Sequence, residues 1–182
     1  MKVWAILPVL FLPCCFAQPA SDYLKSLINP VDIMASSASA AIGQWRDSPS
    51  EWRRGSHAYA HRFVSSFAQH EVYSSLLFGA SHVLAEDNRY VPSGRLDFKG
   101  RLGYALASTV LARHTQPDGT SRRRLSISRI GALAGAAFLA RYWQPRSTRG
   151  FGSVALRFSA SVGSTMGFNV AHEFGPGWLP IQ

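Results

Sequence analysis

The feature that most constrains the fold is a run of aromatic and aliphatic side chains in the first half of the chain. From Tyr59 onward these side chains recur every three, four or seven positions as far as Leu84. That spacing places side chains on one face of an α-helix. The pattern predicts a long helix over residues 55–86, whose stripe consists of Tyr59, Phe63, Phe67, His70, Tyr73, Leu77 and Leu84. Within this stripe, His70 is interpreted as a hydrogen-bonded core histidine.

Three further helices are predicted, over residues 97–114, 126–143 and 152–174. Proline and glycine separate them, at Pro92 and Gly94 and again in the stretch 116–119, because both residues favour turns. Ser126 or Ser128 is a suitable N-cap for the third helix, which should stop before Pro145. The predicted fold class is therefore all-α, a single bundle of about four main helices.

Small residues at helical spacing indicate how these helices pack. On the third helix they are Gly131, Ala132, Gly135 and Ala136, and on the fourth Gly152, Ser159, Gly163 and Gly167. Glycine weakens a helix but lets two backbones approach closely. We expect Gly163 and Gly167 to mark a close contact, either inside the bundle or between two copies in a homo-oligomer. Residues 154–162 also alternate as strands do, so carboxy-terminal β-hairpins are the alternative fold.

The amino terminus has the pattern of a signal peptide. Lys2 precedes a short apolar run over residues 3–12, and small residues at Cys15 and Ala17 favour cleavage before Gln18. The predicted organisation is a signal peptide over 1–17, a flexible arm or linker over 18–50 and a helical domain over 51–182. Lipidation of Cys14 or Cys15 is the alternative, and either reading predicts a periplasmic or outer-envelope protein.

Charge is distributed unevenly along the chain, whose net charge is +9. Residues 1–90 carry seven basic and seven acidic side chains, whereas residues 91–182 carry twelve basic and three acidic ones. Arginine forms two-point contacts with phosphate and carboxylate. We expect an exported basic surface to meet an anionic membrane surface or an acidic polymer, not nucleic acid, through Arg122, Arg123, Arg124 and Arg129. Simple solvation of a basic protein is the competing interpretation.

A second candidate site is the cluster Glu86, Asp87, Arg89 and Tyr90. Two acids, a guanidinium and a phenol in five residues could hold an anion, or serve an exported hydrolase as acid and base together with a histidine. The competing interpretation is an ion-paired helix terminus that ties the long helix to the following turn. His57 and His61 lie one helical turn apart without a third ligand nearby, so no metal and no cofactor are expected.

Several short segments resemble a family of uncharacterised exported proteins of soil bacteria. The likeness rests on Glu86-Asp87-Asn88-Arg89-Tyr90, Arg101 to Leu106, Gly131, Arg141 to Pro145, and Asn169 to Phe174. It covers roughly residues 55–180, and Asn88 stands where the family motif has proline. No activity is implied by this resemblance, which supports a helical exported domain and assigns no catalytic residue.

Overall fold

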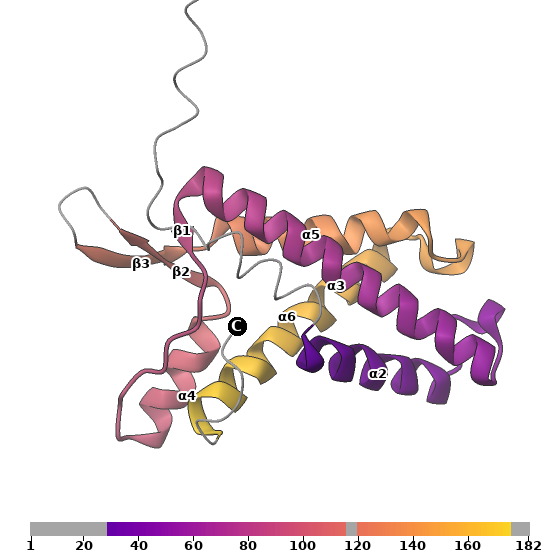
Figure 1. The fold of residues 1–182 in the computed structure, drawn as a ribbon, viewed down its shortest axis with the longest axis horizontal. Coiled ribbons are helices and arrows are strands. Elements are labelled where there is room, and N and C mark those ends of the chain that lie inside the picture. The colour runs from indigo at the N-terminus through magenta and orange to yellow at the C-terminus, as the bar shows by residue number, and fades with distance from the viewer. Residues whose placement is uncertain (1–28, 116–119, 176–182) are drawn as a thin grey trace, which may run out of the picture.

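The computed structural model describes residues 29–115 and 120–175, which are mostly helical (Figure 1). The predicted long helix is confirmed as α3, Ser56–Leu84. It ends at Ala85, whose N–H donates to the carbonyl of Ser81 and whose left-handed backbone (φ 51°) turns the chain out of the helix. This turn starts the short strand β1, Glu86–Asp87.

Part of the predicted flexible arm is instead an ordered helix, α2, Pro30–Trp45. Asn29 caps it by accepting a hydrogen bond from the backbone of Val31, and Pro30 suits the first helical turn. α2 packs along α3, where the hydroxyl of Tyr59 donates to the carbonyl of Ser37 at 3.2 Å. The arm prediction is therefore corrected over 30–45. The remainder of the arm before Asn29, and the predicted signal peptide, lie outside the described residues.

The second predicted helix is too long at its carboxy-terminal end. α4, Phe98–Ala107, is capped by Asp97, but the chain then leaves the helix and forms β2, Leu111–Thr115. β2 pairs antiparallel with β3, Ser121–Leu125, and with β1, giving a three-stranded sheet in the order β1-β2-β3. This hairpin lies earlier in the chain than the predicted alternative, which is a set of β-hairpins in the carboxy-terminal third.

The last two predicted helices are present. α5, Ile127–Leu139, begins at Ser126, which is the N-cap and accepts from the N–H of Arg129. The short helices η2, Ala140–Tyr142, and η3, Arg146–Thr148, lead into α6, Phe151–Phe174. Helix thus replaces the alternating-strand alternative throughout 154–162. A further short helix, η1, Ser50–Trp52, connects α2 to α3.

The core is built mainly from small side chains where α5 lies along α3 (Figure 1). Its buried hydrophobic residues are Leu133 and eight alanines: Ala40, Ala58, Ala105, Ala112, Ala132, Ala136, Ala137 and Ala140. A Cβ added to Gly135 would lie 2.9 Å from Leu76 of α3, so the glycine-mediated approach occurs on α5.

The small-residue stripe of α6 faces outward. Ser159 is exposed, and a Cβ added to Gly152, Gly163 or Gly167 would meet no described atom within 4 Å. The predicted close contact inside the bundle is therefore wrong, while a contact between two copies stays a prediction. Within the described residues, no helix is both long and apolar enough to cross a membrane.

Candidate functional site: an arginine pocket beside the sheet

The small sheet arranges charged side chains in two rows. Asp87 pairs with Arg113, which pairs with Arg123, while Glu86 pairs with His114, which pairs with Arg122. Neighbouring positions on a strand point to opposite faces, so the two rows lie on opposite faces of the sheet. Each row therefore begins with an acid on β1 and ends with an arginine on β3.

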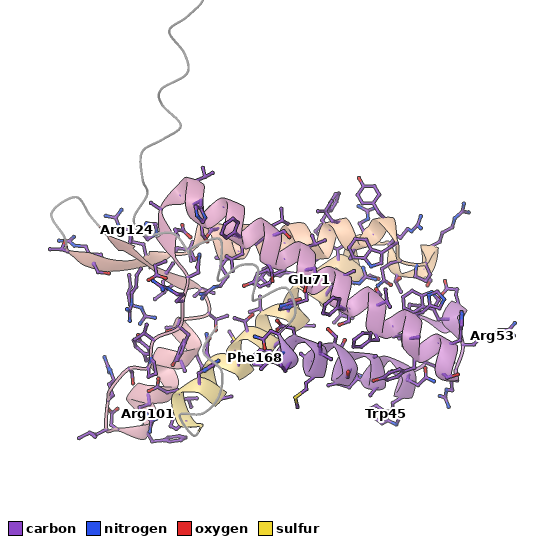
Figure 2. All side chains as sticks on the ribbon, in the orientation of Figure 1. Trp45, Arg53, Glu71, Arg101, Arg124 and Phe168 are labelled. Carbon is purple, nitrogen blue, oxygen red and sulfur yellow. The ribbon has the colours of Figure 1, made fainter. Side chains whose placement is uncertain are left out.

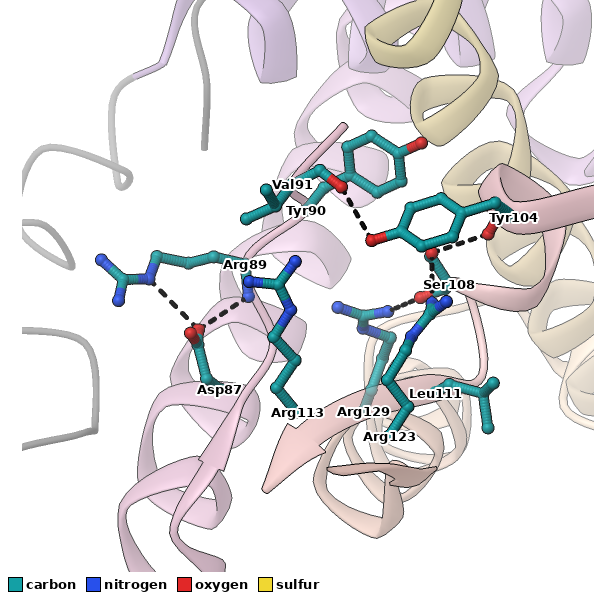
Figure 3. Close-up of a pocket in the computed structure, with 10 residues that line it drawn as sticks. All are labelled: Asp87, Arg89, Tyr90, Val91, Tyr104, Ser108, Leu111, Arg113, Arg123 and Arg129. Carbon is teal, nitrogen blue, oxygen red and sulfur yellow. Dashed lines mark hydrogen bonds and ion pairs between the residues drawn. The ribbon is translucent and has the colours of Figure 1, made fainter. Parts of the chain in front are cut away.

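The first row lines a small pocket at the junction of the sheet with α4 and α5 (Figure 3). Its volume of about 10 Å³ has room for one water-sized group. We call it the arginine pocket, because four of its lining residues are arginines and one is an acid. The lining residues are Asp87, Arg89, Tyr90, Val91, Tyr104, Ser108, Leu111, Arg113, Arg123 and Arg129.

Tyr104 of α4 and Ser108, the C-cap of this helix, fix the position of Arg123. Its Nη2 donates to Ser108 Oγ at 2.5 Å, and its guanidinium carbon lies 4.2 Å from the centre of the Tyr104 ring. The hydroxyl of Tyr104 in turn donates to the carbonyl of Val91 at 3.0 Å. One guanidinium of the pocket is thus held in a defined orientation by a hydrogen bond and a cation–π contact.

The side chain of Arg113 lacks any hydrogen-bond or ion-pair partner in the part of the chain that the structure describes. It lies directly opposite Arg123 across the β2–β3 ladder, where like charges destabilise a pair of strands. The only carboxylate of the pocket, Asp87, is bound by Arg89, whose Nε and backbone N–H each lie 3.1 Å from Oδ1. Four guanidinium groups against one carboxylate leave the pocket with an excess of three positive charges.

Arg129 supplies its positive charge from beneath the pocket. It is 6% exposed, and its guanidinium donates to the backbone carbonyls of Asn88, Ser108 and Thr109. Burial lowers the pKa of Arg129, and this effect exceeds the opposing influence of Tyr73, Glu86 and Asp87. Arg129 was predicted to contact an anionic membrane surface or an acidic polymer. It is instead buried, and it contributes a fixed positive charge to the wall of the pocket.

Glu86 lies behind the pocket and is 2% exposed. Its carboxylate caps α5, accepting from the backbone N–H groups of Ile127 and Ser128 at 3.1 Å and from the hydroxyls of Ser126 and Ser128. Burial raises its pKa, but these hydrogen bonds outweigh burial, so the pKa of Glu86 is lowered overall. His114 Nε2 lies 3.5 Å from Glu86 Oε1, yet neither residue lines the pocket.

Tyr90 lines the pocket but directs its hydroxyl away, to Glu173 Oε2 at 2.7 Å. Glu173 also accepts from the backbone and hydroxyl of Ser93 and from Nε of Arg101 at 3.1 Å. Burial would raise the pKa of Glu173, but the bonds from Ser93, Tyr90 and Arg101 lower it to about 2. Burial, followed by the bond to Glu173, raises the pKa of Tyr90. This carboxylate ties the end of α6 to the segment before α4.

The structure therefore divides the residues predicted to form sites. Five come together in the arginine pocket, Glu86 lies buried behind it, and Arg122 and Arg124 lie on the opposite face of the ribbon. The five are Asp87, Arg89, Tyr90, Arg123 and Arg129. Since Glu86 and Tyr90 use their polar atoms in separate networks, the four residues of the predicted cluster do not converge on one acid–base site.

Sequence reasoning missed Tyr104, Ser108 and Arg113. Arg113 could have been found from the turn predicted over 116–119, because strands that pair symmetrically about position 118 place Arg113 opposite Arg123. Tyr104 and Ser108 carry no comparable signal, since they lie near the end of a helix whose docking on the sheet is a tertiary feature.

An open groove of about 1250 Å³ separates α2 from α6, with α3 and α5 as its floor. His70 lies on its wall, with Nε2 3.2 Å from Oδ1 of the buried Asp32. The expected polar partner of His70 is therefore present, although 29% of its side chain is exposed. The rings of His57 and His61 lie 4.7 Å apart, and no group of three or more candidate metal ligands occurs within 29–115 and 120–175.

Segments that carry the sequence resemblance meet in space. Tyr90, Arg101 and Glu173 share the network described above, and Asn169 Nδ2 donates to the carbonyl of Ala105 at 3.2 Å. No family model matches the chain, and no curated protein or solved structure matches it. Its function is therefore inferred from the geometry of the site.

Proposed function

We propose that this chain is an exported envelope protein, with an interaction or structural role, that binds anionic groups of the cell envelope through the arginine pocket. The anion is a phosphate or carboxylate carried by a lipid or by an acidic polymer. One observation carries the proposal: Arg113 and Arg123 lie opposite each other, while the one carboxylate among the residues lining the pocket, Asp87, is already bound to Arg89. An anion between the two guanidiniums would relieve their repulsion.

The size of the pocket limits what enters it. A volume of about 10 Å³ admits one oxygen-sized part of an anionic group and leaves the rest of the ligand outside. The ligand is thus recognised by its charged end, as expected for a protein that contacts a headgroup or a side group of a polymer. Guanidinium donors in a plane suit such two-point contacts.

The hairpin extends the basic surface beyond the pocket. All five residues of β3 are exposed, and Arg122 and Arg124 project from the other face of the ribbon. Exposed charges of this kind act over a distance of about 8 Å at physiological ionic strength. They would attract an anionic surface or chain, whereas the pocket would hold one group of it.

The test compares Arg113→Gln/Arg123→Gln with wild type in binding to three targets. These are phosphatidylglycerol vesicles, phosphatidylcholine vesicles and the acidic polysaccharide alginate, each titrated at low and at physiological salt. We expect the double variant to bind the anionic targets about tenfold more weakly, because two charge-assisted contacts are lost. Wild-type binding should also weaken with salt.

A matched control, Arg54→Gln/Arg95→Gln, removes two exposed arginines outside the pocket. The same net charge is lost, so a purely diffuse electrostatic attraction would weaken both double variants equally. Equal loss would contradict a role for the pocket, and absence of wild-type binding to every anionic target at low salt would contradict the function. Vesicle binding without alginate binding would identify the lipid as the source of the anion.

A further inference from the structure

The side chains of α5 are distributed in the opposite way to those of a typical surface helix. Its only polar residues, Ser128 and Arg129, are buried, and every residue of α5 that is not buried is apolar. A helix of a soluble protein normally shows its polar side chains to water. The outer face of α5 therefore has the composition of a covered surface.

Large apolar side chains lie at both ends of this face, and small apolar residues lie between them. Ile127 is 63% exposed, Phe138 is 50% exposed, and between them Gly131 and Ala134 are exposed at helical spacing. Leu125 before the helix and Tyr142 after it are 57% and 76% exposed. We call the surface formed by these six residues the α5 face. A group of exposed apolar residues on one helix without polar neighbours is typical of a contact with a partner or a membrane.

Charge indicates which partner fits. Residues 119–172 contain eight arginines and no aspartate or glutamate. Arginines lie at both ends of the α5 face. The exposed Arg122 and Arg124 precede it, and the half-buried Arg141 and the exposed Arg146 follow it (Figure 2 labels Arg124). The guanidinium of Arg141 lies 5.1 Å from the centre of the Phe138 ring, so charge and aromatic surface adjoin.

We propose that the α5 face lies in the headgroup region of an anionic membrane, with the flanking arginines on lipid phosphates. This proposal goes beyond the proposed function by naming the lipid and a second surface, and it rests on that function only for the initial attraction to the membrane. A helix of 13 residues is about 20 Å long, so α5 lies along the surface. Arginine and tyrosine at the ends of an apolar face are typical of interfacial helices.

A second copy of the chain is the alternative occupant, and charge argues against it. Two α5 faces related by a twofold axis would bring flanking arginines of like charge together, and the segment offers no acid to pair with them. An anionic bilayer supplies the missing negative charge from phosphates at the same level as the apolar contact. The membrane therefore satisfies both properties of the surface.

The first experiment measures partition onto phosphatidylglycerol vesicles before and after a wash at 1 M salt. Phe138→Ser and Ile127→Ser should each lower the salt-resistant bound fraction by about tenfold, since each removes an apolar side chain from the interface. Met34→Ser is the matched control, because Met34 is 71% exposed on α2 and should be neutral. Equal loss in all three variants, or no salt-resistant fraction in wild type, would overturn the proposal.

A second measurement keeps the proposal separate from the proposed function. Cys14 and Cys15 are replaced by serine, and an environment-sensitive dye is attached to Phe138→Cys or Met34→Cys. We expect the emission at 138, but not at 34, to shift to the blue on anionic vesicles. Salt-sensitive vesicle binding without this shift would refute the α5 contact and leave the pocket function standing. Sedimentation as a dimer that Phe138→Ser dissociates would show that a second copy covers the face.

Discussion

Two buried carboxylates connect parts of the chain that are distant in sequence. Glu86 joins the end of α3 to the start of α5, and Glu173 joins the end of α6 to Tyr90 and Arg101. Both are paired through several hydrogen bonds, so each one stabilises the fold in its ionised form. By contrast, the ion pair of Asp87 with Arg89 leaves 48% of the arginine side chain exposed, and such a pair contributes little to stability.

Glu173 makes folding sensitive to acid. Its pKa of about 2 in the folded chain lies below the ordinary value of 4.5, so its stabilising effect is complete above pH 4.5 and is lost as the pH falls toward 2. We expect the melting temperature of wild type to fall across this window, and that of Glu173→Gln to start lower and fall less. Asp87→Asn is the control, and should keep the wild-type dependence. Parallel curves for wild type and Glu173→Gln would contradict this account.

Small residues on α5 and α6 serve different purposes although their patterns look alike. Ala137 of α5 is fully buried, whereas Gly163 of α6 has open space around the position of a Cβ. Periodicity alone places both on helical stripes. Only the packing of the other helices decides which stripe is covered.

This difference predicts opposite effects of the same added side chain. Ala137→Leu inserts three carbon atoms into a filled site and should destabilise the chain by about 1–3 kcal/mol. Gly163→Leu replaces a poor helix former at an open site and should stabilise it by up to about 1 kcal/mol. Thermal melting of both variants checks the pair. A destabilised Gly163→Leu, accompanied by loss of a dimer in sedimentation, would instead indicate the predicted contact between copies.

The long helices were predicted from the sequence, whereas the sheet was not. α3, α5 and α6 follow from sustained periodicity and from caps such as Ser126. Residues 111–114 were predicted to belong to the second helix, and pairing of β2 with β3 overrides that local prediction. Arg113 was missed for the same reason, since its place in the site depends on that pairing.

At the scale of the whole molecule, the two proposed contact surfaces are joined by a single element. α5 carries the apolar face on its outside and contributes Arg129 to the arginine pocket beside its first turn. A membrane that received the α5 face would therefore lie near the basic hairpin that precedes this helix (Figure 1). The groove between α2 and α6 lies against the inner side of α5, where Leu133 and Ala136 line it, and not on the α5 face.

The alanine core has a calorimetric consequence. The heat capacity increment of unfolding rises with the apolar area that becomes exposed, and alanine contributes little area per residue. Since the buried hydrophobic residues in the described part of the chain are alanines and one leucine, we expect an increment below about 12 cal/mol/K per residue in differential scanning calorimetry. A value of about 15 would be inconsistent with such a core. Free energy of unfolding should then change only gradually between cold and warm conditions, so that cooling neither strengthens nor weakens the fold by much.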